Sequence, residues 1–159
     1  MLHKTLKNHE KIIERMNEMK TTINWDGKMA FSSTTPSGHE VVMDAPEEVG
    51  GENKGARPTE FLLNAVAGCT GIDIISILTK MRVNPTSFEM EVEGDRAEDH
   101  PKKFTNIHIH YSFEGELPED KVAKAIRLSK DKYCTVSHSL NSEIAASYSI
   151  NGEKGKEEV

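Results

Sequence analysis

The feature that most constrains the fold of this chain is a long apolar stretch that runs from residue 57 to residue 82. Pro58 suits the first turn of a helix, and Glu60 faces the positive end of the helix dipole. Lys80 lies in the last turn, and Pro85 follows shortly after as a stop signal. At a rise of 1.5 Å per residue, these roughly 25 residues predict a helix about 37 Å long.

The apolar residues of this helix are not confined to one stripe, so the sequence predicts burial on nearly all sides. They are Phe61, Leu62, Leu63, Ala65, Val66, Ile72, Ile74, Ile75, Ile77, Leu78 and Met81. One sheet of the size that this chain can form would cover only one side of such a helix. The simplest cover for the other side is a second subunit, and we therefore expect a homodimer with these helices at its centre.

Composition limits the class of protein. A chain of 159 residues is most simply one domain, and its net charge of −6 argues against nucleic acids and anionic membranes as main partners. The N-terminus lacks a run of the signal-peptide type, and no stretch looks long and uncharged enough to span a bilayer. Two cysteines are too few for a disulfide framework. We expect a soluble cytoplasmic protein with reduced thiols.

The remaining chain reads as short strands and two further helical segments. Residues 1–20 form a predicted N-terminal helix, either packed on its own domain or acting as a dimer seam. Asp26-Gly27 predicts a hairpin within residues 21–35. Further strands are expected at 39–43, 88–92, 107–113 and 144–150, a helix at 118–132, a helical turn at 134–140 and a solvated tail at 152–159. This order predicts an α+β fold with mostly antiparallel sheet.

The two cysteines differ in their local surroundings. Asp73 lies one helical turn after Cys69, and a carboxylate there would raise the pKa of the thiol. Glu60 lies about 180° around the helix and ~13 Å along it, so it cannot touch Cys69 of its own chain. Cys134 begins a short helical turn whose free N–H groups would favour a thiolate. On local grounds, Cys134 would be the more reactive thiol.

The histidines suggest a rival interpretation. His108 and His110 point to one side of a predicted strand, and His138 could join them to hold Zn²⁺. The pair lies opposite the apolar face of its strand, however, where histidines are more often solvated. No compact ligand spacing favours a metal site.

The stretch Pro58-Thr59-Glu60-Phe61-Leu62-Leu63-Asn64-Ala65-Val66-Ala67-Gly68-Cys69 resembles the OsmC/organic hydroperoxide resistance superfamily. The likeness continues at Lys132-Tyr133-Cys134-Thr135-Val136-Ser137 and covers residues 21–151, which we expect to form one OsmC-like domain. It implies antiparallel sheets packed around long central helices in an intertwined homodimer. The residues Thr70-Gly71-Ile72-Asp73 look more like the OsmC-like branch than the characterised peroxidases.

The resemblance also implies a chemistry, that of a redox-active cysteine in the oxidative-stress response. Cys69 would be the peroxidatic thiol that reduces an organic hydroperoxide, and Cys134 would resolve its sulfenic acid as a disulfide. A dithiol or small-thiol reductant would then restore both thiols without any cofactor. These roles reverse the ranking that local chemistry gives the two cysteines.

The sequence departs from the peroxidase pattern at the two residues that activate the thiolate. In the characterised peroxidases these are an Arg from the N-terminal strands and a Glu near the start of the central helix. The position of the family's Glu is Thr59, with Glu60 one step away, and the predicted hairpin strands contain no Arg. Arg57 and Glu60 are therefore the candidates to replace that pair. The alternative is a redox sensor or a small apolar-ligand binding protein on the same fold, without peroxidase turnover.

Overall fold

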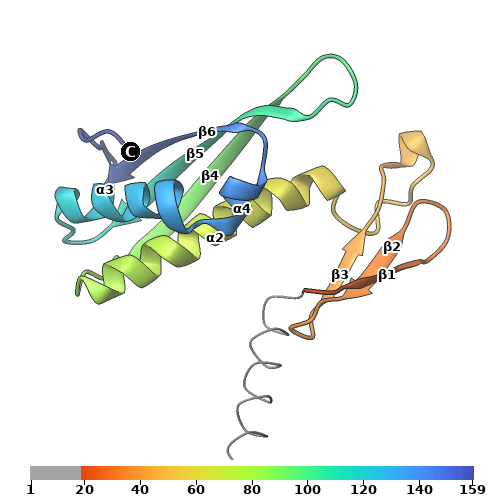
Figure 1. Cartoon of the computed structure of the whole chain (residues 1–159), viewed down its shortest axis with the longest axis horizontal. Coiled ribbons are helices and arrows are strands. Elements are labelled where there is room, and N and C mark those ends of the chain that lie inside the picture. The colour runs from red at the N-terminus through yellow and green to blue at the C-terminus, as the bar shows by residue number, and fades with distance from the viewer. Residues whose placement is uncertain (1–18) are drawn as a thin grey trace, which may run out of the picture. The chain divides into compact units, whose positions relative to one another are not determined.

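The structure is a computed structural model in which residues 19–159 are described (Figure 1). The helix predicted for residues 1–20 lies almost entirely outside them. The chain divides into two compact units, one ending at Pro58 and the other running from Thr59 to Val159. The predicted domain 21–151 contains parts of both units, which are described separately below.

The first unit is a three-stranded antiparallel sheet in the order β1-β2-β3. Its strands are β1 (Thr22–Trp25), β2 (Phe31–Thr34) and β3 (Glu40–Met43). At the turn between β1 and β2, Asp26 N–H donates to the Ala30 carbonyl at 2.9 Å. The predicted hairpin and third strand are confirmed.

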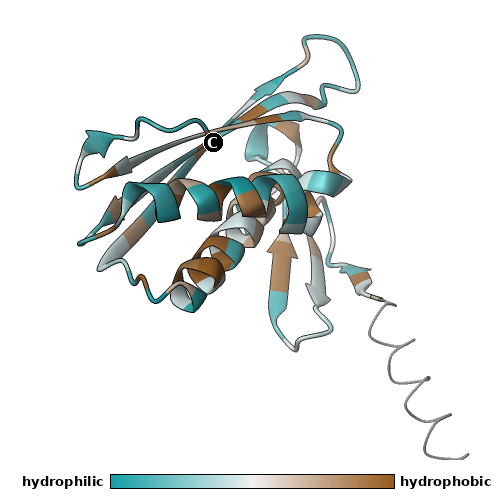
Figure 2. Cartoon of the chain, turned by 60° about the vertical axis from the view of Figure 1, so that its left-hand side comes forward, coloured by the Kyte–Doolittle hydropathy of each residue, from teal (hydrophilic) through white to brown (hydrophobic). Residues whose placement is uncertain are grey.

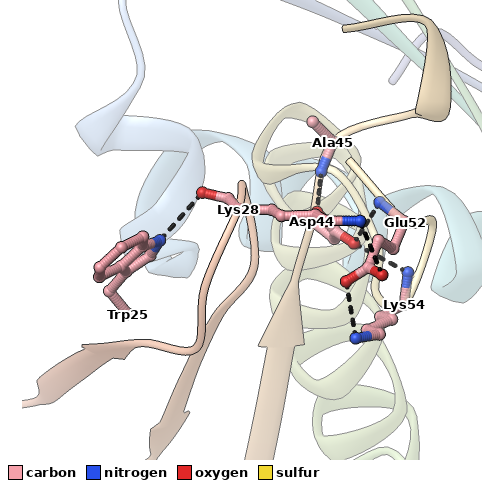
Figure 3. Close-up of polar contacts among 6 residues, drawn as sticks. All are labelled: Trp25, Lys28, Asp44, Ala45, Glu52 and Lys54. Atoms are coloured by element: carbon pink, nitrogen blue, oxygen red, sulfur yellow. Dashed lines mark hydrogen bonds and ion pairs between the residues drawn. The ribbon is translucent and has the colours of Figure 1, made fainter. Parts of the chain in front are cut away.

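The loop after β3 is held by one buried carboxylate (Figure 3). Asp44 accepts the backbone N–H groups of Ala45, Glu52 and Lys54 at 2.7, 3.0 and 3.0 Å. A single 3₁₀ turn, η1 (Glu47–Val49), interrupts the loop. Because three amides from both ends of the loop converge on one side chain, Asp44 holds the loop in its conformation within the first unit.

The second unit is a four-stranded sheet with helices. It contains α2 (Pro58–Lys80), β4 (Ser87–Arg96), β5 (Phe104–Glu114), α3 (Glu119–Leu128), a π turn η2 (Ser129–Tyr133), α4 (Thr135–Ser139), β6 (Glu143–Ile150) and β7 (Glu153–Lys154). The sheet order is β4-β5-β6-β7. The β5–β6 pair is parallel and the other pairs are antiparallel. The predicted α+β fold is confirmed, and the one parallel pair arises because α3, η2 and α4 form a crossover between β5 and β6.

The core of this unit joins α2, β5 and α3. Alternate residues of β5 face inward and are almost fully buried, as the alternation in the sequence predicted. The buried cluster consists of Val66, Ile74, Leu78, Val83, Ile107, Ile109, Tyr111, Phe113, Val122, Ala123, Ala125, Ile126 and Tyr148. α2 and α3 therefore share the same face of the sheet.

α2 is buried along only one of its sides within the chain. Its buried residues include Val66, Ile74 and Leu78, whereas Ile72 is 74% exposed and Leu62 is 40% exposed. Figure 2 shows hydrophobic residues along the length of this helix. The sequence prediction that one sheet could cover only one side of the helix agrees with this pattern.

The length and composition of α2 also correct one prediction. Among the described residues, α2 is a helix long and apolar enough to cross a membrane, contrary to the expectation that no stretch could do so. The core helix of a soluble protein meets the same two criteria. The packing of α2 into the core cluster accounts for the apolar residues on its buried side.

The last residues, predicted as a solvated tail, make specific contacts despite their exposure. Glu119 accepts the Tyr148 hydroxyl at 2.9 Å and the backbone N–H of Lys156. Arg127 forms an ion pair with Glu157 at 3.3 Å. These contacts hold the end of the chain against α3 and β6.

We predict that Asp44→Asn lowers the melting temperature of the protein by a few degrees. The Lys54 N–H is the largest cause that lowers the pKa of Asp44 below its ordinary value of 3.8, with burial opposing it. A lowered carboxyl pKa contributes stability that is present above the unfolded pKa and is lost as the pH falls through the folded pKa. The difference in melting temperature, measured by circular dichroism, therefore shrinks below about pH 4.

Glu40→Gln, at an exposed position of β3 in the same unit, serves as the matched control and is expected to melt like the wild type. A destabilisation by Asp44→Asn that stays constant down to about pH 3 would contradict the role assigned to the charged carboxylate.

Candidate functional site

The two cysteines and one carboxylate meet in the second unit. The Sγ atoms of Cys69 and Cys134 and a carboxylate oxygen of Asp73 all lie within 4.8 Å of one another. Cys69 and Asp73 are one turn apart on α2, and Cys134 lies between η2 and α4. Both cysteines are free thiols; Cys69 is partly exposed, whereas Cys134 is fully buried. Two residues 65 positions apart in the sequence thus form one site.

The π turn η2 positions Cys134 against α2. The N–H of Cys134 donates to the Ser129 carbonyl at 2.9 Å, which closes the turn. The Ser129 hydroxyl, fully buried, donates to Asp73 Oδ2 at 3.0 Å. Ser129 therefore links the turn that carries Cys134 to the helix that carries Cys69.

The start of α4 supplies hydrogen-bond donors to both sulfurs. Cys134 is the N-cap of α4, and its Sγ accepts the Ser137 N–H at 3.3 Å. The backbone N–H of Val136 donates to the Cys69 sulfur. The first N–H groups of a helix have no partner within the helix, and they favour a negatively charged acceptor. The sequence predicted N–H groups without a helical partner beside Cys134, and the structure has them at Val136 and Ser137. The Val136 N–H acts on Cys69 rather than on Cys134.

The surroundings of Cys69 raise its pKa above the ordinary value. Burial is the largest cause, and Cys134 and the Asp73 carboxylate add to it. The Val136 N–H acts in the opposite direction. The direction of the effect that the sequence predicted for Asp73 on the pKa of Cys69 agrees with this arrangement.

A buried tyrosine completes the inner wall of the site. The Tyr111 hydroxyl is hydrogen-bonded to Thr70, the residue next to Cys69. Burial raises the pKa of Tyr111 to about 12, and the nearby Cys134 adds to the shift. Tyr111 is therefore a neutral hydroxyl at any physiological pH. The sequence placed it on the inward face of β5 but gave no sign that it would reach the cysteines.

A cavity opens beside the cluster between α2 and α3. Its volume is about 410 Å³, and it is lined by Asp73 of the cluster and by Tyr133, the residue before Cys134, but by neither cysteine. Its other lining residues are Ser76, Ile77, Lys80, Met81, Lys124 and Leu128. The cavity combines an apolar floor with two lysines, so a molecule of mixed polarity could approach Asp73 through it.

Arg57 and Glu60, the proposed activating pair, come from the region where the loop meets α2. Arg57 donates to the Gly55 carbonyl at 2.8 Å and to Asn53 Oδ1 at 2.7 Å. Glu60 is exposed in the first turn of α2, more than two turns before Cys69. Within the second unit, Glu60 is not a member of the cluster formed by the two sulfurs and Asp73.

The histidines do not gather into a metal site within residues 19–159. His108 and His110 both contact Ser147 Oγ, at 3.0 and 2.8 Å, on the outer face of the sheet. His138 Nδ1 lies 2.9 Å from the Cys134 carbonyl oxygen. The only metal-type cluster among the described residues contains the two cysteines and Asp73 and no histidine.

Comparisons with known proteins agree on one family. A family model described as OsmC-like protein matches residues 51–149. Protein YhfA of Escherichia coli (strain K12) is 33% identical over 132 residues, which are 82% of this chain and 96% of YhfA. A solved structure from Aquifex aeolicus VF5 has 30% identity and a TM-score of 0.71, and the match covers 86% of this chain and 99% of that one.

A structure from Legionella pneumophila, described as an organic hydroperoxide resistance protein OsmC, has a TM-score of 0.64. It is 16% identical, and the match covers 84% of this chain and 98% of that one. At this identity the likeness establishes the shared fold alone.

We predict that Asp73→Asn lowers the pKa of Cys69, because it removes a nearby negative charge. The comparison is made in a Cys134→Ser background, where Cys69 is the only thiol. The rate of alkylation by iodoacetamide near neutral pH is expected to rise by up to about tenfold, which corresponds to a shift of one unit. Ser76→Ala, at an exposed position one turn further along α2, is the control. An unchanged rate–pH profile in Asp73→Asn would show that the carboxylate has no influence on the thiol.

Proposed function

We propose that this chain, which belongs to the OsmC-like family, reduces organic hydroperoxides with Cys69 as the peroxidatic thiol and Cys134 as the resolving thiol. The observation that carries the proposal is the approach of two free thiols from distant parts of the chain to within 4.8 Å. The partial exposure of Cys69 and the complete burial of Cys134 support this division of roles.

The proposed reaction has three steps. The Cys69 thiolate attacks the terminal oxygen of ROOH, the O–O bond breaks, and the alkoxide takes a proton to leave as ROH. Cys69 becomes a sulfenic acid, which the Cys134 thiol attacks to form a disulfide and release water. An external dithiol or two small thiols then reduce the disulfide by exchange, returning both cysteines to thiols.

The hydrogen bonds of α4 support the first two steps. The Val136 N–H favours the thiolate at Cys69, and the Ser137 N–H contacts Cys134. A disulfide requires the two sulfurs to approach to about 2.05 Å. We propose that the segment of Cys134, which precedes a helix of only five residues, moves to bring the two sulfurs together.

Two further parts of the proposal come from the family resemblance. Arg57 and Glu60 are proposed to activate the thiolate in place of the family's usual pair. The working form is proposed to be a cytoplasmic homodimer. The exposed apolar residues of α2, such as Ile72 and Leu62, support a second subunit because a large apolar surface on a soluble protein indicates an interaction site.

A second candidate function is a redox sensor on the same fold. It is favoured by the raised pKa of Cys69 and by the Asp73 carboxylate beside it, both of which slow attack on a peroxide. The thiols of such a protein would be oxidised once per chain, and the protein would not consume further peroxide when a reductant is added. The other form of this alternative is a protein that binds a small apolar ligand in the cavity beside Asp73 and carries out no thiol chemistry.

We predict that Cys69→Ser abolishes consumption of cumene hydroperoxide, whereas Cys134→Ser still reacts once and accumulates a sulfenic acid at Cys69. Peroxide loss with dihydrolipoate as reductant measures turnover, and dimedone labelling with mass mapping detects the sulfenic acid. His138→Ala is the control, because its ring contacts the Cys134 carbonyl rather than a sulfur. Wild-type turnover in Cys69→Ser would reject the peroxidase mechanism, and a single slow turnover in the wild type would favour the sensor.

We predict that the chain has twice the 17.7 kDa mass of one protomer in light scattering, and that Ile72→Glu produces the monomer. Ile72 is 74% exposed in the single chain, and a charge at this position would be costly to bury against a partner. Asn141→Glu, at an exposed position before β6, is the control and should stay dimeric. A monomeric wild type would refute the dimer.

A further inference from the structure

We propose that the reduced form of this site binds one Zn²⁺-like divalent cation through Cys69, Asp73 and Cys134. The proposal does not depend on peroxide turnover, since it concerns the dithiol before any oxidation. It assigns a metal to the site in place of the histidine set that the sequence suggested.

The three ligand atoms are already almost close enough to share one ion. They lie within 4.8 Å of one another. Zn–S bonds of about 2.3 Å and a Zn–O bond of about 2.1 Å, in tetrahedral geometry, place such atoms roughly 3.5–3.8 Å apart. The approach that binding requires is therefore about 1 Å or less, which a change of side-chain torsion can supply.

The chemistry of the donor set selects the class of metal. Thiolates favour Zn²⁺ and related borderline or soft cations, whereas Mg²⁺ and Ca²⁺ require oxygen ligands. Two thiolates and a carboxylate provide three protein ligands, which is the number found in zinc sites that keep a fourth position open. Each bound Zn²⁺ would displace one proton from Cys69 and one from Cys134.

The groups around the cluster make hydrogen bonds that would orient the three side chains as metal ligands. The N–H groups of Val136 and Ser137 donate to the two sulfurs, an arrangement that also stabilises metal-bound thiolates. The Ser129 hydroxyl donates to Asp73 Oδ2 at 3.0 Å, which orients the carboxylate. In the proposed site, the other oxygen of Asp73 would bind the metal.

The site also has a route to solvent. Asp73 borders the cavity of about 410 Å³ between α2 and α3. Cys134 is fully buried, so the fourth ligand would enter from the side of Asp73 and Cys69. Water or a small polar ligand in this cavity would complete the tetrahedron.

The test is a titration of the reduced, chelator-treated, full-length chain with Co²⁺ under anaerobic conditions. One equivalent per chain is expected to produce a sulfur-to-cobalt charge-transfer band and the intense visible bands of tetrahedral Co²⁺. One equivalent of Zn²⁺ is expected to remove both. Cys69→Ser and Cys134→Ser should each weaken the charge-transfer band, and Asp73→Asn, which is nearly isosteric, should lower the affinity by at least about tenfold.

A double variant His108→Ala/His110→Ala is the matched control, because these residues could bind Co²⁺ on the outer face of the sheet. It is expected to give the wild-type spectrum. Absence of the charge-transfer band in the wild type, or an unchanged affinity in Asp73→Asn, would overturn the site. Because the titration contains no peroxide, thiols that are inert to hydroperoxide leave this result intact, and turnover without a cobalt spectrum rejects the metal site alone.

Discussion

Val66, Ile74 and Leu78 lie on one stripe of α2 and are fully buried against the inward-facing residues of β5 and α3. Each such side chain contributes about 1.5–3 kcal/mol relative to leaving it exposed. Their burial fixes how α2 is rotated about its own axis, and this rotation decides where Cys69 and Asp73 point. Gly71 faces the side chain of Met90 on β4, which would have to move if a Cβ were added, since that Cβ would lie 2.7 Å from Met90 Cε. The chemistry of the site is therefore set by packing several residues away from the sulfurs.

Much of this fold follows from the sequence because its signals are local. Asp26-Gly27 marks the first hairpin, alternation marks the inward face of β5, and the apolar run after Pro58 marks α2. The parallel pairing of β5 with β6 could not be read in the same way. It depends on which strand edge the chain reaches after α3, and that is decided by tertiary packing.

The site shows the same division between local and distant information. The sequence alone predicted that Asp73 would raise the pKa of Cys69 and that a short helical turn would begin at Cys134. It did not indicate that a π turn would carry the Ser129 hydroxyl to Asp73, because π turns have no clear sequence signature. The sequence also did not indicate that Cys134 would be fully buried, because burial by distant segments is not visible in the neighbours of a residue.

The crossover between β5 and β6 gives oxidation a consequence beyond reactivity. Cys134 lies in this crossover and Cys69 lies on α2, so a bond between them would enclose β4, β5 and α3 in one covalent ring. A ring of about 65 residues removes roughly 4 kcal/mol of conformational entropy from the unfolded chain. In the proposed cycle, the dithiol and disulfide forms would differ in their resistance to unfolding and to proteolysis. The lifetime of the protein in the cell would then depend on whether Cys69 and Cys134 are thiols or a disulfide.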